Sequence, residues 1–70
     1  MRVLYQRTNI DIPNDFIPSD VQKDILDNWK PGYNLFSITQ IAERNEKTRG
    51  HVKRKVALLR KMGLVELAHK

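Results

Sequence analysis

The chain has 70 residues, and its 13 Lys and Arg against 8 Asp and Glu give a formal net charge of +5 at pH 7. A chain of this length is expected to form one domain (1–70), and the absence of cysteine excludes disulfides and a Cys-based zinc site. No apolar run approaches the ~20 residues that span a bilayer, and the first residues are too polar for a signal peptide, so we expect a cytoplasmic protein without a membrane partner.

Residues 1–17 are expected to form an N-terminal strand and a connector. Residues 3–8 are rich in β-forming side chains, which favours a short strand. Residues 10–18 contain two prolines and several turn formers, which indicates an extended connector. The apolar side chains of this connector are expected to lie on the core: Ile10, Ile12, Phe16 and Ile17.

A first helix is predicted over residues 19–30. Ser19 and Gln22 have the spacing of a capping box, in which the serine accepts from the backbone ahead and the glutamine reaches back. Four apolar residues then fall on one helical face: Val21, Ile25, Leu26 and Trp29. Pro31 and Gly32 are expected to stop the helix.

A second helix is predicted over residues 37–45, because Ser37 and Gln40 repeat the capping-box spacing. Ala42 is small enough for another helix to cross closely. Three aromatic residues around the preceding turn could stack single-stranded bases or fill the core: Trp29, Tyr33 and Phe36. Core filling is favoured, because Trp29 continues the apolar face of the first helix.

The third predicted helix, residues 48–62, carries much of the positive charge. Residues 43–70 hold nine Lys and Arg against three Glu, whereas residues 1–42 hold four against five Asp. Helical spacing gathers apolar side chains on one face: Val52, Val56, Leu59 and Met62. The opposite face holds Arg49, Gly50, Lys53, Arg54, Ala57, Arg60 and Lys61. An isolated basic helix is often only solvated, but a basic face opposite an apolar one also suits a nucleic-acid groove.

Local signals also predict how the third helix begins and ends. Thr48 is expected to cap its N-terminus, and Gly63 stands where a left-handed C-cap belongs. Residues 64–68 alternate enough to form a strand that leaves the helix.

The segment from Ser37 to Glu66 resembles the helix-turn-helix of winged-helix DNA-binding domains, especially MarR-like regulators. The resemblance rests on a joint spacing: Ala42, Thr48, Val52, Val56 and Leu59, closed by Gly63-Leu64-Val65. It implies a mainly α fold with a small β component, a three-helix winged-helix-like helix-turn-helix. In that fold residues 48–62 are the recognition helix, which lies in the major groove.

The chain departs from the family pattern at two places. The family has an apolar residue, a glycine and another apolar residue where this chain has Asn45-Glu46-Lys47. Only seven residues follow Gly63, which leaves room for one strand but not for the hairpin of a full wing. Either residues 3–8 supply the partner strand, or the wing is short or absent.

The resemblance, carried over residue by residue, places five residues in the groove, with Ala57 one turn further in: Thr48, Arg49, Gly50, Lys53 and Arg54. Arginine suits bidentate contact with guanine, whereas lysine acts as a point charge on phosphate. Two further residues complete the candidate DNA-binding set. Thr39 stands at the N-terminus of the second helix, where free N–H groups favour phosphate, and Lys47 lies in the turn. Gly50 either permits close approach of DNA or is a tolerated first-turn glycine.

These features predict a small transcriptional regulator that binds double-stranded DNA sequence-specifically, without catalysis, cofactor, metal or small-molecule substrate. Because one helix reads only a few base pairs, a homodimer is expected. Two alternatives stay open. A phage or plasmid replication or partition module would differ in the location of its sites, and a protein-interaction module would ignore duplex DNA at physiological salt.

Overall fold

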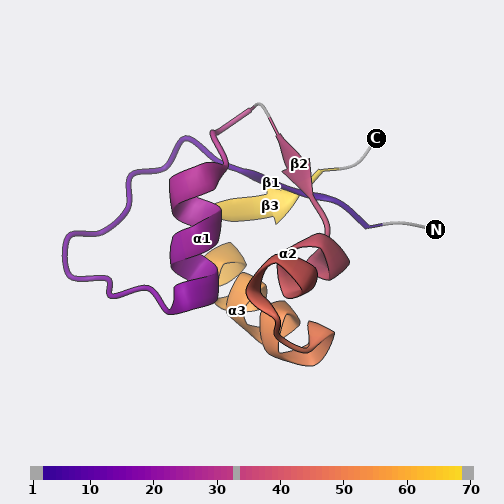
Figure 1. Cartoon of the computed structure of the whole chain (residues 1–70). Helices are drawn as coiled ribbons and strands as arrows, with labels where there is room; N and C mark the ends of the chain where they lie inside the picture. The colour runs from indigo at the N-terminus through magenta and orange to yellow at the C-terminus, as the bar shows by residue number, and fades with distance from the viewer. Residues whose placement is uncertain (1–2, 33, 69–70) are drawn as a thin grey trace.

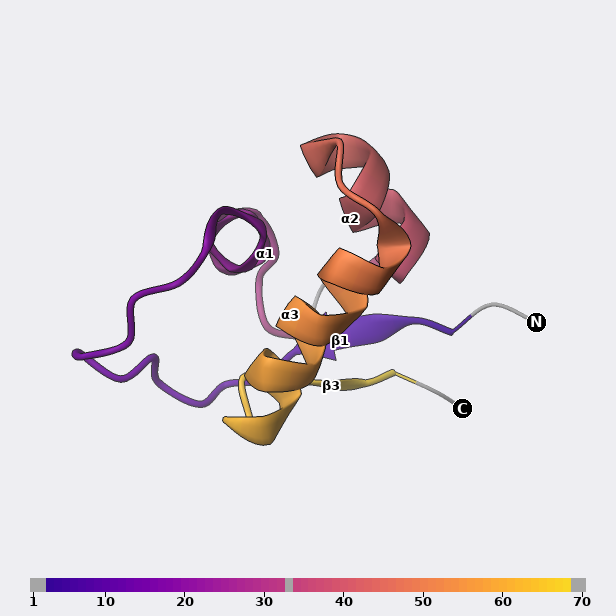
Figure 2. The same ribbon diagram turned by 90° about the horizontal axis from the view of Figure 1, so that it is seen from below.

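The computed structural model describes residues 3–32 and 34–68. Its elements follow the order β1 (Tyr5–Arg7), α1 (Asp20–Asn28), β2 (Leu35–Phe36), α2 (Ile38–Asn45), α3 (Arg49–Lys61) and β3 (Val65–Leu67). The strands form an antiparallel sheet in the order β2-β1-β3, and the helices pack beside it (Figures 1 and 2). The described chain is thus a mixed α/β fold with three helices and a three-stranded antiparallel sheet.

β1 is the central strand, although it stands at the start of the chain. Gln6 lies opposite Leu35 of β2 on one side and opposite Glu66 of β3 on the other. The Gln6 Nε2 atom donates to Glu66 Oε2 over 2.6 Å. Of the two alternatives left open by the sequence, residues 3–8 therefore do supply the strand that pairs with the segment after α3.

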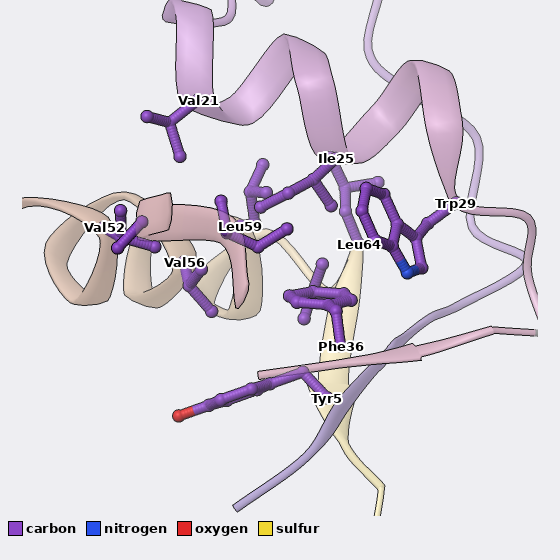
Figure 3. Packing of buried hydrophobic residues seen from close by; sticks show 12 residues of the cluster. Tyr5, Val21, Ile25, Trp29, Phe36, Val52, Val56, Leu59 and Leu64 are labelled. Atoms are coloured by element: carbon purple, nitrogen blue, oxygen red, sulfur yellow. The ribbon is translucent and has the colours of Figure 1, made fainter. Parts of the chain in front are cut away.

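The core lies between the helices and the sheet (Figure 3). Nine side chains are almost fully buried there: Val21, Ile25, Phe36, Ile41, Val52, Val56, Leu59, Leu64 and Val65. The Phe36 ring meets the Trp29 ring edge-on at a centroid distance of 5.6 Å and stacks on Tyr5 at 5.8 Å. Core filling by Trp29 and Phe36 is thus confirmed, whereas Tyr33 lies outside the described residues.

The prediction that the isoleucines of the connector pack on the core is wrong. Ile10, Ile12 and Ile17 are 53%, 40% and 89% exposed, and of the four apolar side chains only Phe16 packs against the core. The Phe16 N–H donates to the Pro13 carbonyl over 3.1 Å, and the chain around this turn bows away from the helices (Figure 1). Because this turn directs only the Phe16 side chain toward the core, the isoleucines of the connector stay exposed to solvent.

α1 begins as predicted but ends two residues early. The capping box is present, because the Gln22 N–H donates to Ser19 Oγ and the Ser19 N–H donates to Gln22 Oε1. Trp29 is extended, with φ −117° and ψ 127°. The buried Arg7 side chain donates to the carbonyls of Leu26 (3.0 Å) and Trp29 (2.9 Å), so β1 holds a cation at the negative end of the helix.

The two later helices are also bounded by local hydrogen bonds. Ser37 Oγ accepts from the Gln40 N–H over 3.1 Å, but Gln40 is exposed and only this half of the predicted second box forms among the described residues. Thr48 Oγ1 accepts from the His51 N–H over 3.2 Å and caps α3. Gly63, at φ 81°, adopts the expected left-handed conformation after the helix.

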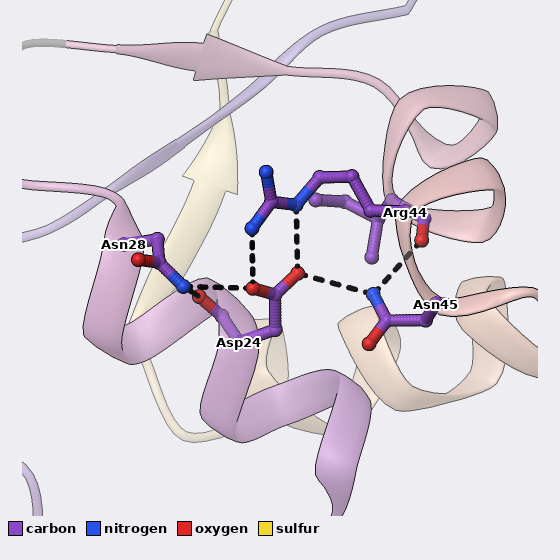
Figure 4. A network of polar contacts seen from close by, with 5 residues as sticks. Asp24, Asn28, Arg44 and Asn45 are labelled. Atoms are coloured by element: carbon purple, nitrogen blue, oxygen red, sulfur yellow. Dashed lines mark hydrogen bonds and ion pairs between the residues drawn. The ribbon is translucent and has the colours of Figure 1, made fainter.

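Asp24 joins α1 to α2 through a network of charged hydrogen bonds (Figure 4). Its carboxylate accepts from Arg44 Nη2 over 2.7 Å and from Nε over 3.0 Å, an almost parallel bidentate pair. It also accepts from the side-chain amides of Asn28 and Asn45. The bond from Arg44, helped by the two amides, lowers the pKa of Asp24 below its ordinary value of 3.8 against the opposing effect of burial.

Asp24→Asn should lower the free energy of unfolding at pH 7 by about 1–2 kcal/mol, because charged hydrogen bonds between two helices are lost. Since the pKa of Asp24 is lowered by folding, its contribution is present above the ordinary pKa of 3.8 and is lost as the pH falls through the folded value. Urea unfolding at neutral pH and below that value should therefore show the difference shrinking.

The matched control is Asp27→Asn, which removes the same charge from an exposed position of α1 and should cost less than about 0.5 kcal/mol at pH 7. Equal losses in the two variants would mean that the network adds nothing to the placement of α2.

Candidate nucleic-acid interface

α3 is amphipathic in the way its sequence indicates. Val52, Val56 and Leu59 are buried, and the helix packs through them against α1, α2 and the sheet. All seven residues of the opposite face are exposed: Arg49, Gly50, Lys53, Arg54, Ala57, Arg60 and Lys61. The packing of the apolar face thus turns the basic face to solvent.

The cations on this face have no acidic partner in the described part of the chain. Arg49–Lys61 contains no Asp or Glu. Among residues 3–32 and 34–68, the one ion pair within 4.0 Å joins Arg44 of α2 to Asp24 of α1. Arg60 instead lies over the Tyr5 ring, with Cζ 6.0 Å from the ring centroid. The positive charge of α3 is therefore directed outward rather than neutralised within the fold.

An open hollow lies where the start of β1, the N-terminus of α2 and the first turns of α3 meet. Eight residues line it: Val3, Tyr5, Ser37, Ile38, Thr39, Arg49, Gly50 and Lys53. A second hollow, on the side of the turn between α2 and α3, is lined by Thr39, Ala42, Glu43, Glu46, Lys47 and Arg49. Thr39 and Arg49 border both hollows.

The structure thus brings together most, but not all, of the sequence-predicted site. Thr39, Arg49, Gly50 and Lys53 surround the first hollow, and Lys47 joins Thr39 and Arg49 at the second. Thr48 is exposed, and its hydroxyl oxygen accepts the capping hydrogen bond of α3. Arg54 is exposed and lines neither hollow.

Sequence reasoning missed the apolar wall of the first hollow. Val3 precedes β1, and Tyr5 is the first residue of that strand. Tyr5 reaches this place because β1 pairs with both β2 and β3. Ile38, which packs partly against the core, also borders the hollow. Local sequence pattern carries no signal for Val3 and Tyr5, because they are separated from Arg49 by more than forty positions in the chain.

The turn between α2 and α3 is polar, unlike the corresponding turn of the winged-helix family that the sequence resembles, and it is closed by hydrogen bonds. Glu46 adopts φ 55° and ψ 44°, a left-handed conformation, where the family has glycine. The Lys47 N–H donates to the Ala42 carbonyl over 3.0 Å, which closes the end of α2. Asn45 donates through Nδ2 to the Ile41 carbonyl and to Asp24, so hydrogen bonds anchor the turn where the family has an apolar residue.

Gly50 has no packing reason to be glycine. A Cβ atom built there would meet nothing within 4 Å, and the φ of this residue is not in the left-handed region. Glycine near the start of a helix costs up to about 1 kcal/mol relative to alanine. The fold itself therefore gains nothing from the missing side chain.

No family model, curated protein or solved structure matches this chain. Among residues 3–32 and 34–68, no helix is long and apolar enough to cross a membrane, and no group of three or more acidic or histidine side chains could hold a metal ion.

Glu46→Gly should raise the free energy of unfolding by about 0.5–1 kcal/mol. A non-glycine residue in the left-handed conformation costs the folded state roughly 1–2 kcal/mol, and glycine removes this cost. Glycine also makes the unfolded chain more flexible, which lowers stability by the smaller amount of roughly 0.5–1 kcal/mol. Denaturant unfolding measures the change. The control Glu43→Gly places glycine inside α2 at an exposed position and should destabilise by about 1 kcal/mol. A Glu46→Gly protein less stable than the parent would contradict the strain argument.

Proposed function

We propose that this chain binds double-stranded DNA through α3, as a winged-helix-like helix-turn-helix protein acting as a small transcriptional regulator. The observation that carries the proposal is the row of exposed cations on α3, Arg49, Lys53 and Arg54, without acidic partners in the described chain. Proteins that bind duplex DNA neutralise phosphates with such cations. The burial of the opposite face, which holds the row rigidly outward, adds to this support.

The dimensions of α3 are compatible with the major groove. Its 13 residues span about 20 Å, and the major groove, about 12 Å wide, admits an α-helix. Arg49 and Arg54 have the donor geometry to read guanine edges, whereas Lys53 suits phosphate. Thr39 lies beside Arg49 at the first turn of α2, where backbone N–H groups also favour a phosphate.

The short sheet gives limited further support for a winged-helix-like arrangement. β3 leaves α3 through the left-handed Gly63 and pairs antiparallel with β1. In this proposal, β1 takes the place of the second strand of a wing hairpin. DNA contact then depends on α2 and α3, with no role assigned to the sheet beyond supporting them.

Arg49→Ala/Lys53→Ala should weaken binding to a labelled random duplex and reduce its salt dependence. Each lost phosphate contact reduces the magnitude of the slope of log K against log salt by about 0.9, so a reduction of about 1 is expected from Lys53, the residue of the pair assigned to phosphate. Fluorescence anisotropy across a salt series measures both quantities.

The matched control is Lys23→Ala/Lys30→Ala, which removes the same charge from exposed positions on and after α1. Binding by this control should stay close to that of the parent protein. Equal losses in both double variants would indicate a nonspecific charge effect. Absence of duplex binding by the parent protein at low salt would refute the proposal and favour an acidic protein partner for α3.

Gly50→Ala should stabilise the fold by up to about 1 kcal/mol and yet weaken DNA binding about tenfold. The added methyl improves helix propensity and meets no atom of the chain, but on the helical wheel it lies between Lys53 and Arg54, on the face assigned to the groove. Thermal unfolding and anisotropy on the same samples test the two effects separately. Unchanged affinity together with increased stability would mean that Gly50 is only a tolerated first-turn glycine.

A further inference from the structure

The connector presents apolar side chains to solvent among acidic ones. Ile12 and Ile17 are 40% and 89% exposed, and Asp11 and Asp15 beside them are exposed as well. Residues 9–19 contain no Lys or Arg. In Figure 1 this segment bows out from the body beside α1, so its outer surface is free of contact with the helices. Two large apolar side chains exposed on one segment offer a surface that a partner could cover.

The connector is held in shape before any partner arrives. Phe16 packs against the core, and its N–H closes a turn with the Pro13 carbonyl over 3.1 Å. At the start of the segment, Thr8 Oγ1 donates to the Gly63 carbonyl, and at the end Pro18 restricts the backbone before the capped α1. A segment ordered in this way loses little conformational entropy on docking.

A surface of complementary character lies on the C-terminal half of α3. A shallow hollow there is lined by Ala57, Leu58, Arg60 and Lys61. Leu58 is 48% exposed, and the two cations flank it. An apolar centre with a basic rim is the counterpart of the apolar and acidic connector.

The start of the connector lies beside the C-terminal end of α3, the part of the helix that carries this hollow. The Ile10 Cδ1 atom is 3.0 Å from the position that a Cβ atom would take on Gly63, so the connector starts beside the end of α3. Two copies related by a two-fold axis can form this contact twice, because the connector of each copy then lies on the α3 hollow of the other.

We propose that two copies of this chain associate in this manner, with Ile12 and Ile17 of each copy on the Leu58 hollow of the other. Asp11 and Asp15 would face Arg60 and Lys61 of the opposite copy. Because the contact uses none of Arg49, Gly50 and Lys53, it goes beyond the proposed DNA binding and stands or falls without it. The contact is small, and the net charge of +5 on each copy opposes it, so association is weak and concentration-dependent.

Sedimentation velocity over a concentration series, without DNA, tests the apolar part of this contact. The mass of the parent protein should rise toward that of two copies, and Ile17→Ser or Leu58→Ser should each abolish the rise. Leu35→Ser is the matched control, because Leu35 is 45% exposed but belongs to β2. A parent protein that stays monomeric throughout, or association that survives both test substitutions, overturns the proposal. Circular dichroism checks that each variant is folded.

Charge reversal tests the pairing itself. Asp11→Lys/Asp15→Lys and Arg60→Glu/Lys61→Glu should each be monomeric, because like charges then meet at both contacts of the two-fold pair. An equimolar mixture of the two variants should associate. In the mixed pair, the Lys-bearing connector of one variant meets the Glu-bearing hollow of the other, and the remaining contact joins a native connector to a native hollow. A mixture no heavier than its components, under conditions where the parent protein associates, overturns the assignment of partners.

Discussion

The burial of one face of α3 is the interaction on which the rest of this domain depends. Val52, Val56 and Leu59 form the part of the core that α1, α2 and the sheet share. A chain of 70 residues has one small core, so an element that loses contact with this face has no other to join. The same packing holds the cations of α3 in solvent, so stability and the proposed function both follow from one helix.

Polar contacts between distant elements supplement this small core. Arg7 of β1 donates to the last carbonyls of α1, Gln22 of α1 donates to the Lys55 carbonyl of α3, and Asp24 binds Arg44 of α2. Each is a directional bond, and directional bonds restrict the angle between elements more than apolar contact does. The relative placement of α2 and α3 shapes the two hollows. It thus depends partly on residues that do not line either hollow.

Charge is divided between two regions of the fold rather than mixed over its surface. The connector and α1 carry the aspartates, whereas α3 carries cations that form no ion pair with any of residues 3–32 and 34–68. Such a division favours long-range attraction toward a polyanion on one side and toward a basic surface on the other. The proposed DNA contact is assigned to the first turns of α3, and the proposed self-association is assigned to its last turns.

The sequence by itself determined the features that arise within a few residues of one another. These are the caps at Ser19, Ser37 and Thr48, the left-handed Gly63, and the two faces of α3, because side-chain hydrogen bonds and helical periodicity are local. Most of the candidate DNA-binding residues were placed by the same periodicity. Only the tertiary structure decided the central position of β1 and the hydrogen bonds of the Arg7 side chain at the end of α1. It also decided the exposure of the connector isoleucines and the wall that Val3 and Tyr5 add to the first hollow. These features depend on which distant segments meet. The pairing of β1 with β3, at opposite ends of the chain, leaves no local pattern in the sequence of either strand.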